Sequence, residues 1–303
     1  MISTNSPLVS VIIITYNSAQ YVIETLESVK SQSWRHIELI ITDDCSTDNT
    51  IPICQEWLQN NSHFFVNTHL ITTVYNTGTP ANCNRGLKKA TGDWIKTISG
   101  DDILLPNCIS DNLNYAKQSN ALFIVSDIHK IDESGKTLSD KIVNTGLEYI
   151  VNLPTAKKQL KAYSRWPTFL NTPTFFCKKE IMKLIDYNDE DFRIYEDMTV
   201  IYRVTRMNVK VSYMNKTTVG YRIHAESVSR NNKMEEMRKK EAYRVFKKYR
   251  VKNLNILNPI DLSIYYESWL RYKYKGINGR KGVATLNKLS LFYWYLRLLG
   301  IRR

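Results

Sequence analysis

A run of seven residues near the N-terminus, residues 9–15 (VSVIIIT), limits the fold of this chain more than any other feature. Six of the seven are Val, Ile or Thr, and apolar residues do not alternate with polar ones. This pattern predicts a strand that is covered on both faces. Strands of this kind belong to parallel sheets with helices on either side, so the chain is expected to have an α/β fold.

Strand and helix patterns alternate through the first 130 residues. This order predicts a doubly wound, mostly parallel sheet. The alternation weakens after residue 130, where residues 136–165 give no clear pattern. The predicted strands are residues 37–42, 64–74, 94–98, 122–126, 174–177, 209–213 and 218–223. One predicted helix is capped by Asn17-Ser18 and ends near residue 30, and the next is capped within residues 46–49 and ends near residue 58. The other predicted helices are residues 80–90, 180–185, 196–206 and a segment after Pro106.

The net charge of +13 comes entirely from the C-terminal part of the 303-residue chain. Residues 233–303 contain 18 Lys and Arg against 5 Asp and Glu, whereas residues 1–232 are neutral. This division predicts a catalytic body, residues 1–232, followed by a basic helical extension. A basic helix over residues 234–249 and an aromatic-rich run over residues 289–299 suit an anionic membrane surface, with a solvated, ordinarily packed helix as the alternative. No nucleic-acid-binding motif accompanies the charge, so nucleic acid is not an expected partner.

Cysteine usage and the N-terminus indicate the compartment. The five cysteines show no paired spacing, which indicates reduced thiols. Residues 1–7 are polar, and the sequence has no apolar stretch of about 18 residues, so neither a signal peptide nor a membrane-spanning helix is expected. We expect a cytoplasmic protein, peripheral on the inner face of the plasma membrane.

Polar clusters follow directly on three predicted strands: Thr15-Tyr16-Asn17, Asp43-Asp44 and Ser99-Gly100-Asp101-Asp102. Ligands of doubly wound sheets bind beyond the carboxyl ends of the strands, so these clusters should share one crevice. Adjacent carboxylates repel each other, and a bound Mg²⁺ or Mn²⁺ shared with a diphosphate relieves that repulsion. The alternative is that the acids only favour helix N-termini.

The ordered set of these segments resembles the inverting glycosyltransferases of family 2, which have the GT-A fold. The expected fold class is therefore α/β, a GT-A-like doubly wound sheet with a C-terminal basic helical extension. The resemblance implies a nucleotide-binding half of about residues 1–130 and an acceptor half of about residues 131–232. The segments that carry it are residues 9–17 (VSVIIITYN), 28–34 (SVKSQSW), 40–48 (IITDDCSTD), 76–78 (NTG), 90–92 (ATG) and 99–102 (SGDD).

The resemblance implies roles for individual residues of the strand-end clusters. Asp102 is expected to bind the metal more directly than Asp101. Family members often have an Arg after the Asn-x-Gly segment, where this chain has Cys83, and Arg85 is the candidate to replace it. The expected nucleotide contacts are Thr15, Tyr16, Asn17, Asp44, Arg85 and Asp101.

Two later segments complete the expected site. Glu196-Asp197 opens a predicted helix, where the resemblance places the general base, and we assign it to Asp197 with Glu196 as its neighbour. The segment Tyr221-Arg222-Ile223-His224 resembles the one that follows the base in bacterial members. It implies His224 as a metal ligand and Arg222 as a diphosphate ligand.

The expected reaction is inverting transfer of a hexose or N-acetylhexosamine from a UDP-sugar. The implied acceptor is a glycan, linked to polyprenyl diphosphate, in O-antigen or capsule synthesis. One alternative is a nucleotidyltransferase, but residues 15–19 lack the Gly-rich, basic phosphate loop of such enzymes. The other is a non-catalytic nucleotide-sugar-binding protein, against which the presence of Asp101, Asp102 and Asp197 counts.

Overall fold

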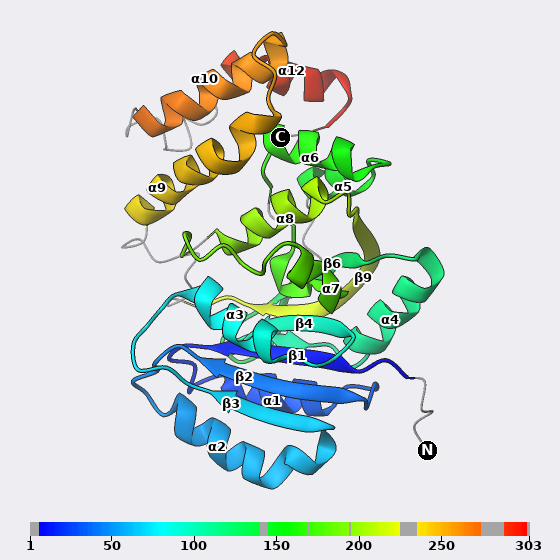
Figure 1. Ribbon diagram of the computed structural model, residues 1–303, viewed down its shortest axis with the longest axis vertical. Helices are drawn as coiled ribbons and strands as arrows, with labels where there is room; N and C mark the ends of the chain where they lie inside the picture. Colours follow the sequence, from blue (N-terminus) through cyan, green and yellow to red (C-terminus); the bar gives the residue numbers. More distant parts are fainter. Residues whose placement is uncertain are drawn as a thin grey trace.

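The computed structural model describes residues 6–139, 145–168, 170–193, 195–224, 235–273 and 288–301. Within these residues, nine strands form one mixed sheet in the order β3-β2-β1-β4-β8-β6-β9-β5, with β7 paired to β6 (Figure 1). The strands are β1 (Val9–Thr15), β2 (Ile37–Asp43), β3 (Asn67–Ile71), β4 (Trp94–Ser99), β5 (Ile103–Leu104), β6 (Phe123–Ile131), β7 (Thr137–Ser139), β8 (Phe176–Lys178) and β9 (Val211–Arg222).

The first four strands form the parallel sheet that the sequence predicts. β1 pairs in parallel with both β2 and β4, and β3 pairs in parallel with β2. The second half of the sheet is mixed, because β8 runs antiparallel to its neighbours β4 and β6. The predicted α/β fold class is confirmed.

Helices cover both faces of the sheet, as expected for strands that are apolar throughout. Val9, Val11 and Ile13 of β1 pack into one core layer, and Ile12 packs into the other. The first layer contains α1 (Val22–Lys30), α2 (Thr50–Asn61) and α4 (Cys108–Ser119). The second contains α3 (Thr79–Lys89), α5 (Thr145–Val151), α6 (Ala156–Arg165), α7 (Lys179–Leu184) and α8 (Glu196–Arg206).

Several predicted boundaries are wrong. The strand predicted at 122–126 continues to Ile131, and the one predicted at 64–74 covers only residues 67–71. The first helix begins at Val22 with Tyr21 at its N-cap, rather than directly after Asn17-Ser18, because Asn17 adopts a left-handed φ of 49° and the chain turns there before it winds into a helix. The two strands predicted at 209–213 and 218–223 are one strand, β9, which shifts register against β6 and so stays paired through the bend. Short 3₁₀ turns lie at η1 (Ser62–Phe64) and η2 (Thr172–Thr174).

The C-terminal helices are α9 (Glu235–Val245), a π-helical turn η4 (Phe246–Arg250), a 3₁₀ turn η5 (Val251–Asn253), α10 (Pro259–Lys273) and α12 (Leu291–Leu298). The start expected for the basic helix, Met234, lies outside the described residues. Val245 and Tyr249 belong to the same core layer as α8. α10 and α12 lie at the end of the molecule opposite α2 (Figure 1). In the part of the chain that is described, no helix is long and apolar enough to cross a bilayer.

Candidate active site

The three polar clusters meet at one edge of the sheet. Strand register places Thr15 beside Asp43 and Ile14 beside Ser99. The main-chain N–H of Asp44 donates to the carbonyl of Thr15 (3.1 Å), and that of Gly100 donates to the carbonyl of Ile14 (2.9 Å). The clusters therefore lie at one edge of the sheet, as the prediction of a shared crevice requires.

Side-chain hydrogen bonds fix the first two loops to each other. The Thr15 hydroxyl donates to Oδ2 of Asp43 (2.7 Å), and the main-chain N–H of Asn17 donates to Oγ of Ser46 (2.8 Å). Asn17 therefore braces the neighbouring loop. The side chain of Tyr16 is left half exposed at the edge of the sheet.

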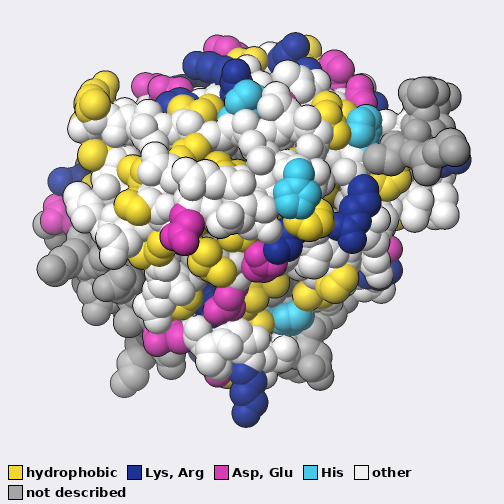
Figure 2. Space-filling view, turned by 90° about the horizontal axis from the view of Figure 1, so that it is seen from below, with side chains coloured by type: hydrophobic (Ala, Val, Ile, Leu, Met, Phe, Trp, Pro, Cys, Tyr) yellow, Lys and Arg dark blue, Asp and Glu magenta, His cyan; other side chains and the backbone are white. Residues whose placement is uncertain are grey.

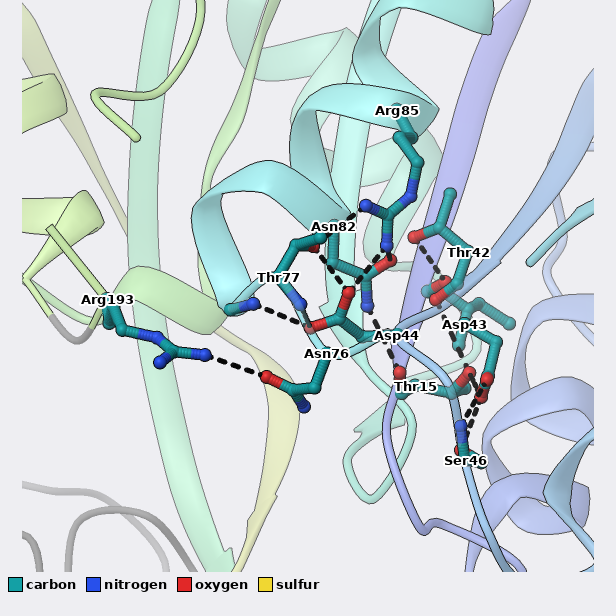
Figure 3. A network of polar contacts seen from close by, with 12 residues as sticks. Thr15, Thr42, Asp43, Asp44, Ser46, Asn76, Thr77, Asn82, Arg85 and Arg193 are labelled. Carbon is teal, nitrogen blue, oxygen red and sulfur yellow. Dashed lines mark hydrogen bonds and ion pairs between the residues drawn. The ribbon is translucent and has the colours of Figure 1, made fainter. Parts of the chain in front are cut away.

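The Asp44 carboxylate is the centre of a network of polar contacts at this edge (Figure 3). It is almost fully buried and accepts hydrogen bonds from the N–H groups of Thr77 (2.9 Å) and Gly78 (2.7 Å). The Thr77 hydroxyl (2.6 Å) and Nη2 of Arg85 (2.8 Å) donate to its other oxygen. Burial opposes ionisation, but these hydrogen bonds outweigh it and hold the pKa of Asp44 below its usual range. Asp44 and Arg85, both expected nucleotide contacts, thus lie together and shape the loop at residues 76–78.

Arg193 connects this loop to the segment that precedes α8. Its Nη2 donates to Oδ1 of Asn76 (3.0 Å), as Figure 3 shows, and its main-chain N–H donates to Oε1 of the buried Glu241 of α9 (2.8 Å). Gly78 has a φ of 93°, which only glycine adopts readily. Sequence reasoning missed Arg193, because an isolated Arg in an acid-rich loop gives no signal of its distant partner.

The two acids of the Ser99-to-Asp102 turn have different environments. Asp102 is buried, and its Oδ1 accepts from the main-chain N–H of Arg222 (2.9 Å). Burial, and secondly the neighbouring charge of Asp101, raise the pKa of Asp102 well above its usual value. Asp101 keeps a quarter of its side chain exposed, and its Oδ2 lies 2.9 Å from Nε2 of His224. The structure therefore presents Asp101, rather than Asp102, together with His224.

Arg222 differs from the expected diphosphate ligand. Its guanidinium is buried, with Nε donating to the carbonyl of Asp101 (2.7 Å) and Nη2 pairing with Oε2 of Glu24 (2.7 Å). Its Nη1 donates to the carbonyls of Asp132 (3.1 Å) and Glu133 (2.9 Å). Because its three nitrogens bind protein groups, Arg222 holds the acidic turn in place instead of facing a ligand.

Asp197 lies in the first turn of α8, where the sequence predicts it. Its Oδ2 accepts from the hydroxyl of Thr172 (2.7 Å), and its Oδ1 accepts from the main-chain N–H of Met198 (2.6 Å). Loss of hydration raises the pKa of Asp197 in spite of these hydrogen bonds. Burial, and secondly the charge of Asp197, raise the pKa of Glu196 well above its usual value. A carboxylate whose pKa is raised towards neutrality is suited to proton transfer.

A cavity of about 70 Å³ lies beside this acid pair. Glu196 and Asp197 line it together with Ile14 of β1 and Thr97 of β4, close to where these strands end. The Oε2 atom of Glu196 is buried without a hydrogen-bond partner. The acid pair therefore lies across the same strands whose ends carry the other clusters.

Asp101 and His224 fit part of a divalent-cation site. They offer a carboxylate oxygen and an imidazole nitrogen, ligands that Mn²⁺ accepts. Within the described ranges, no three His, Cys, Asp or Glu side chains are arranged to hold a metal. Diphosphate oxygens and water would have to supply the remaining ligands of a cation bound at this pair.

The parallel half of the sheet and the acidic loops at its carboxyl edge are typical of α/β proteins that bind a ligand at that edge. Residues 10–185 match the sequence profile described as Glycosyl transferase family 2, which is more than half of the chain, and the chain belongs to this family. It is therefore a glycosyltransferase, which decides against the nucleotidyltransferase and the non-catalytic alternatives.

Known relatives and structures agree with this assignment. The chain is 25% identical over 231 residues to the glycosyltransferase GlyG of Streptococcus pneumoniae serotype 4, which covers 74% of each chain. It is 34% identical to EpsE of Bacillus subtilis over 214 residues, 66% of this chain and 73% of that protein. The crystal structure of S. aureus TarS 1-349 in complex with UDP covers 90% of this chain with a TM-score of 0.61 at 19% identity, and 74% of that chain is matched. The mannosyltransferase PcManGT of Pyrobaculum calidifontis, solved with GDP-Man and Mn²⁺, covers 98% of this chain, also with a TM-score of 0.61, at 16% identity and over 80% of its own length. At these identities the two structures show a shared GT-A fold.

Proposed function

We propose that this glycosyltransferase moves a hexose or N-acetylhexosamine from a UDP-sugar to a glycan acceptor with inversion at the anomeric carbon. The observation that carries the proposal is the gathering of three polar loops at one sheet edge, with Asp197 across the ends of β1 and β4. A donor at the edge and a base on the facing helix are the two parts that a direct displacement needs. TarS has been solved with UDP-GlcNAc, which supports a UDP-sugar as donor.

The nucleotide is assigned to the loops after β1 and β2. The half-exposed ring of Tyr16 offers a face for the base, and Thr15 and Asn17 shape the loop that presents it. The carboxylate of Asp44 already accepts hydrogen bonds from Thr77, Gly78 and Arg85. We therefore propose that Asp44 and Arg85 shape the nucleotide pocket.

The diphosphate end is assigned to the turn after β4. We propose Asp101 and His224 as the protein ligands of a Mn²⁺ or Mg²⁺ ion, with buried Asp102 supporting the turn through Arg222. Such a cation stabilises the charge of the leaving diphosphate. Arg222 fixes the main chain of Asp101 and thereby the direction of its carboxylate.

Asp197 is the proposed general base. It takes the proton of the acceptor hydroxyl as that oxygen bonds to the anomeric carbon, while the bond from this carbon to the nucleoside diphosphate breaks on the opposite face. Thr172 and the N–H of Met198 hold the carboxylate in one orientation. Glu196 lines the adjoining cavity and is assigned to the acceptor side.

A donor-hydrolysis screen tests the proposal. Purified protein is incubated with a panel of UDP-, GDP- and dTDP-sugars in Mn²⁺, Mg²⁺ or EDTA, and the released nucleotide is identified. Release of UDP from one UDP-sugar in Mn²⁺ or Mg²⁺, and not in EDTA, is the expected result. Activity with GDP-sugars alone, or undiminished activity in EDTA, would contradict the donor or the metal assignment.

The acceptor and location follow from the same proposal. We propose a glycan linked to polyprenyl diphosphate, in the synthesis of an O-antigen or capsule, used by an enzyme that is peripheral on the cytoplasmic face of the plasma membrane. The basic and aromatic C-terminal residues support a place at such a surface. We also propose that residues 1–232 form the catalytic part and that residues 233–303 form the extension that meets the membrane.

A further inference from the structure

Helix α10 has an unusual distribution of side chains for a surface helix. It buries the acidic side chains of Asp261 and Glu267, whereas Leu262, Tyr265 and Tyr266 are exposed. A helix on the surface of a globular protein normally presents its charged face to water and its apolar face to the core. The exposed apolar side therefore needs an explanation.

Buried ion pairs fix this orientation. Oδ1 of Asp261 pairs with Nε of Arg165 in α6 (2.7 Å), and Oδ2 pairs with Nζ of Lys161 in the same helix. The main-chain N–H of Asn255 donates to Oδ2 as well (2.8 Å). Turning α10 to hide its apolar side would break both pairs and leave the mostly buried Arg165 without its partner, which is unfavourable. The outward face is therefore part of the folded structure.

Helix α12 extends the same apolar surface. Phe292 and Leu296 are buried with Ile264 of α10 in a small cluster that joins the two helices. A groove of about 340 Å³ runs between them, lined in part by Leu262, Tyr266, Leu270, Leu289 and Leu291. The exposed apolar side chains of this region together form what we call the α10–α12 face. They are Ile256, Leu257, Leu262, Tyr265, Tyr266, Tyr272, Leu289, Leu291, Trp294, Leu298 and Leu299.

Exposed apolar side chains are concentrated on this face. Of the 21 large ones among the described residues, 11 belong to it, although it comes from a small part of the chain. The other end of the molecule, seen from below in Figure 2, also presents apolar side chains, but they lie among charged side chains of both signs and polar ones. The groove joins several of these side chains into one apolar surface, and such a surface marks a site of interaction, unlike single scattered apolar residues.

Charge identifies the partner. Residues 233–303 carry 18 basic and 5 acidic side chains, so a second copy of this chain would bring like charge against the face. The exposed side chains of Lys273, Lys288 and Arg297 lie on the same two helices or beside them. Tyr and Trp among leucines, bordered by Lys and Arg, match the headgroup zone of an anionic bilayer.

We propose that the α10–α12 face docks the protein onto an anionic lipid bilayer. Apolar side chains of the face enter the headgroup boundary, and the surrounding cations meet lipid phosphates. The turn η4 contributes less charge than its sequence indicates, because Lys248 pairs with Asp189 and Asp191, each at 2.7 Å, within the protein. This docking rests on the peripheral membrane location proposed above and is independent of which sugar is transferred.

Vesicle flotation with the full chain tests the proposal. One set of vesicles is phosphatidylcholine alone, and in the other about a third of the lipid is phosphatidylglycerol. Binding to the anionic vesicles, with weakening at high salt, is the expected result. The triple variant Leu257→Ser, Leu289→Ser and Leu298→Ser should lower this partition by about tenfold or more, because each of these side chains is mostly exposed and free to enter lipid.

A matched control alters the same number of exposed apolar side chains elsewhere, namely Val66→Ser, Leu138→Ser and Leu184→Ser, and should bind as the unaltered chain does. A second measurement uses vesicles with brominated acyl chains, which should quench Trp fluorescence in the unaltered chain and less so in Trp294→Phe. Equal binding by the α10–α12 triple and the control, or no binding to anionic vesicles by the unaltered chain, would overturn the proposal. A dimer in light scattering that the α10–α12 triple dissociates would assign the face to self-association and overturn it as well.

Discussion

Replacing Asp197 by Asn tests the chemistry of the site most directly. The Asp197 carboxylate accepts from the hydroxyl of Thr172 and from the N–H of Met198. An Asn side chain keeps the second hydrogen bond through its oxygen, and its amide can donate to the Thr172 oxygen once that hydroxyl rotates. The fold should therefore change in stability by no more than about 1 kcal/mol, the net worth of one hydrogen bond.

The loss of activity should be much larger than the loss of stability. Without a base the acceptor hydroxyl must release its proton unaided, and a positioned base contributes roughly 10²–10⁴ to the rate. We therefore expect the activation free energy to rise by about 3–5 kcal/mol, which lowers kcat by roughly 10²–10⁴-fold, with little change in the KM for the donor. Transfer to acceptor, measured as product formed from a labelled donor, gives kcat, and thermal unfolding gives stability.

The pH dependence separates a base from a structural acid. Because burial raises the pKa of Asp197, activity should be complete above this raised pKa and be lost as pH falls through it. Thr172→Val removes a hydrogen bond to the ionised form, so the acidic limb of the rate profile should move to higher pH. A rate for Asp197→Asn within a few-fold of the unaltered enzyme, or a Thr172→Val profile that does not move, would refute the assignment.

Three further substitutions test the rest of the site. Asp101→Asn should raise the Mn²⁺ concentration for half-maximal donor hydrolysis by roughly tenfold or more. Asp102→Asn should raise it less, because Asp102 is buried and bound to the main-chain N–H of Arg222. A larger effect of Asp102→Asn would make Asp102 the metal ligand. Arg222→Met should destabilise the fold by about 3 kcal/mol, because the carbonyls that Arg222 binds lose their donor, and a thermal midpoint within a degree of the original would contradict this. Tyr16→Ala should weaken UDP binding about tenfold in calorimetry if the half-exposed ring stacks on the base, and an unchanged Kd would remove Tyr16 from the site.

Several features of the site were accessible from the sequence because they depend on neighbours in the chain. Strands that are apolar on both faces predict a parallel sheet, and the carboxyl ends of parallel strands share one edge. The meeting of Thr15 with Asp43 and of Ile14 with Ser99 follows from this rule. The start of α8 at Glu196 was also predicted to the residue.

Other features depended on contacts between distant parts of the chain. The motif at residues 90–92 is one of those that carry the family resemblance. In the structure, the N–H and hydroxyl of its Thr91 both donate to the buried carboxylate of Glu38, each at 2.8 Å. Thr172, which orients Asp197, lies in a segment without periodic pattern. Pairings of this kind form only when loops fold against one another, so spacing in the sequence does not predict them.

The sequence alone determined the parallel first half of the sheet, the alternation of its strands and helices, and the edge at which acids gather, since hydrophobic patterning and turn residues act locally. Tertiary structure decided which acid of the Asp101-Asp102 pair stays accessible, because Arg222 comes from a strand 120 residues away and covers Asp102. It also decided that α10 presents its apolar side to solvent, because Asp261 is held by Lys161 and Arg165 of α6. A helical pattern defines a face, but the elements packed against the helix decide where that face points.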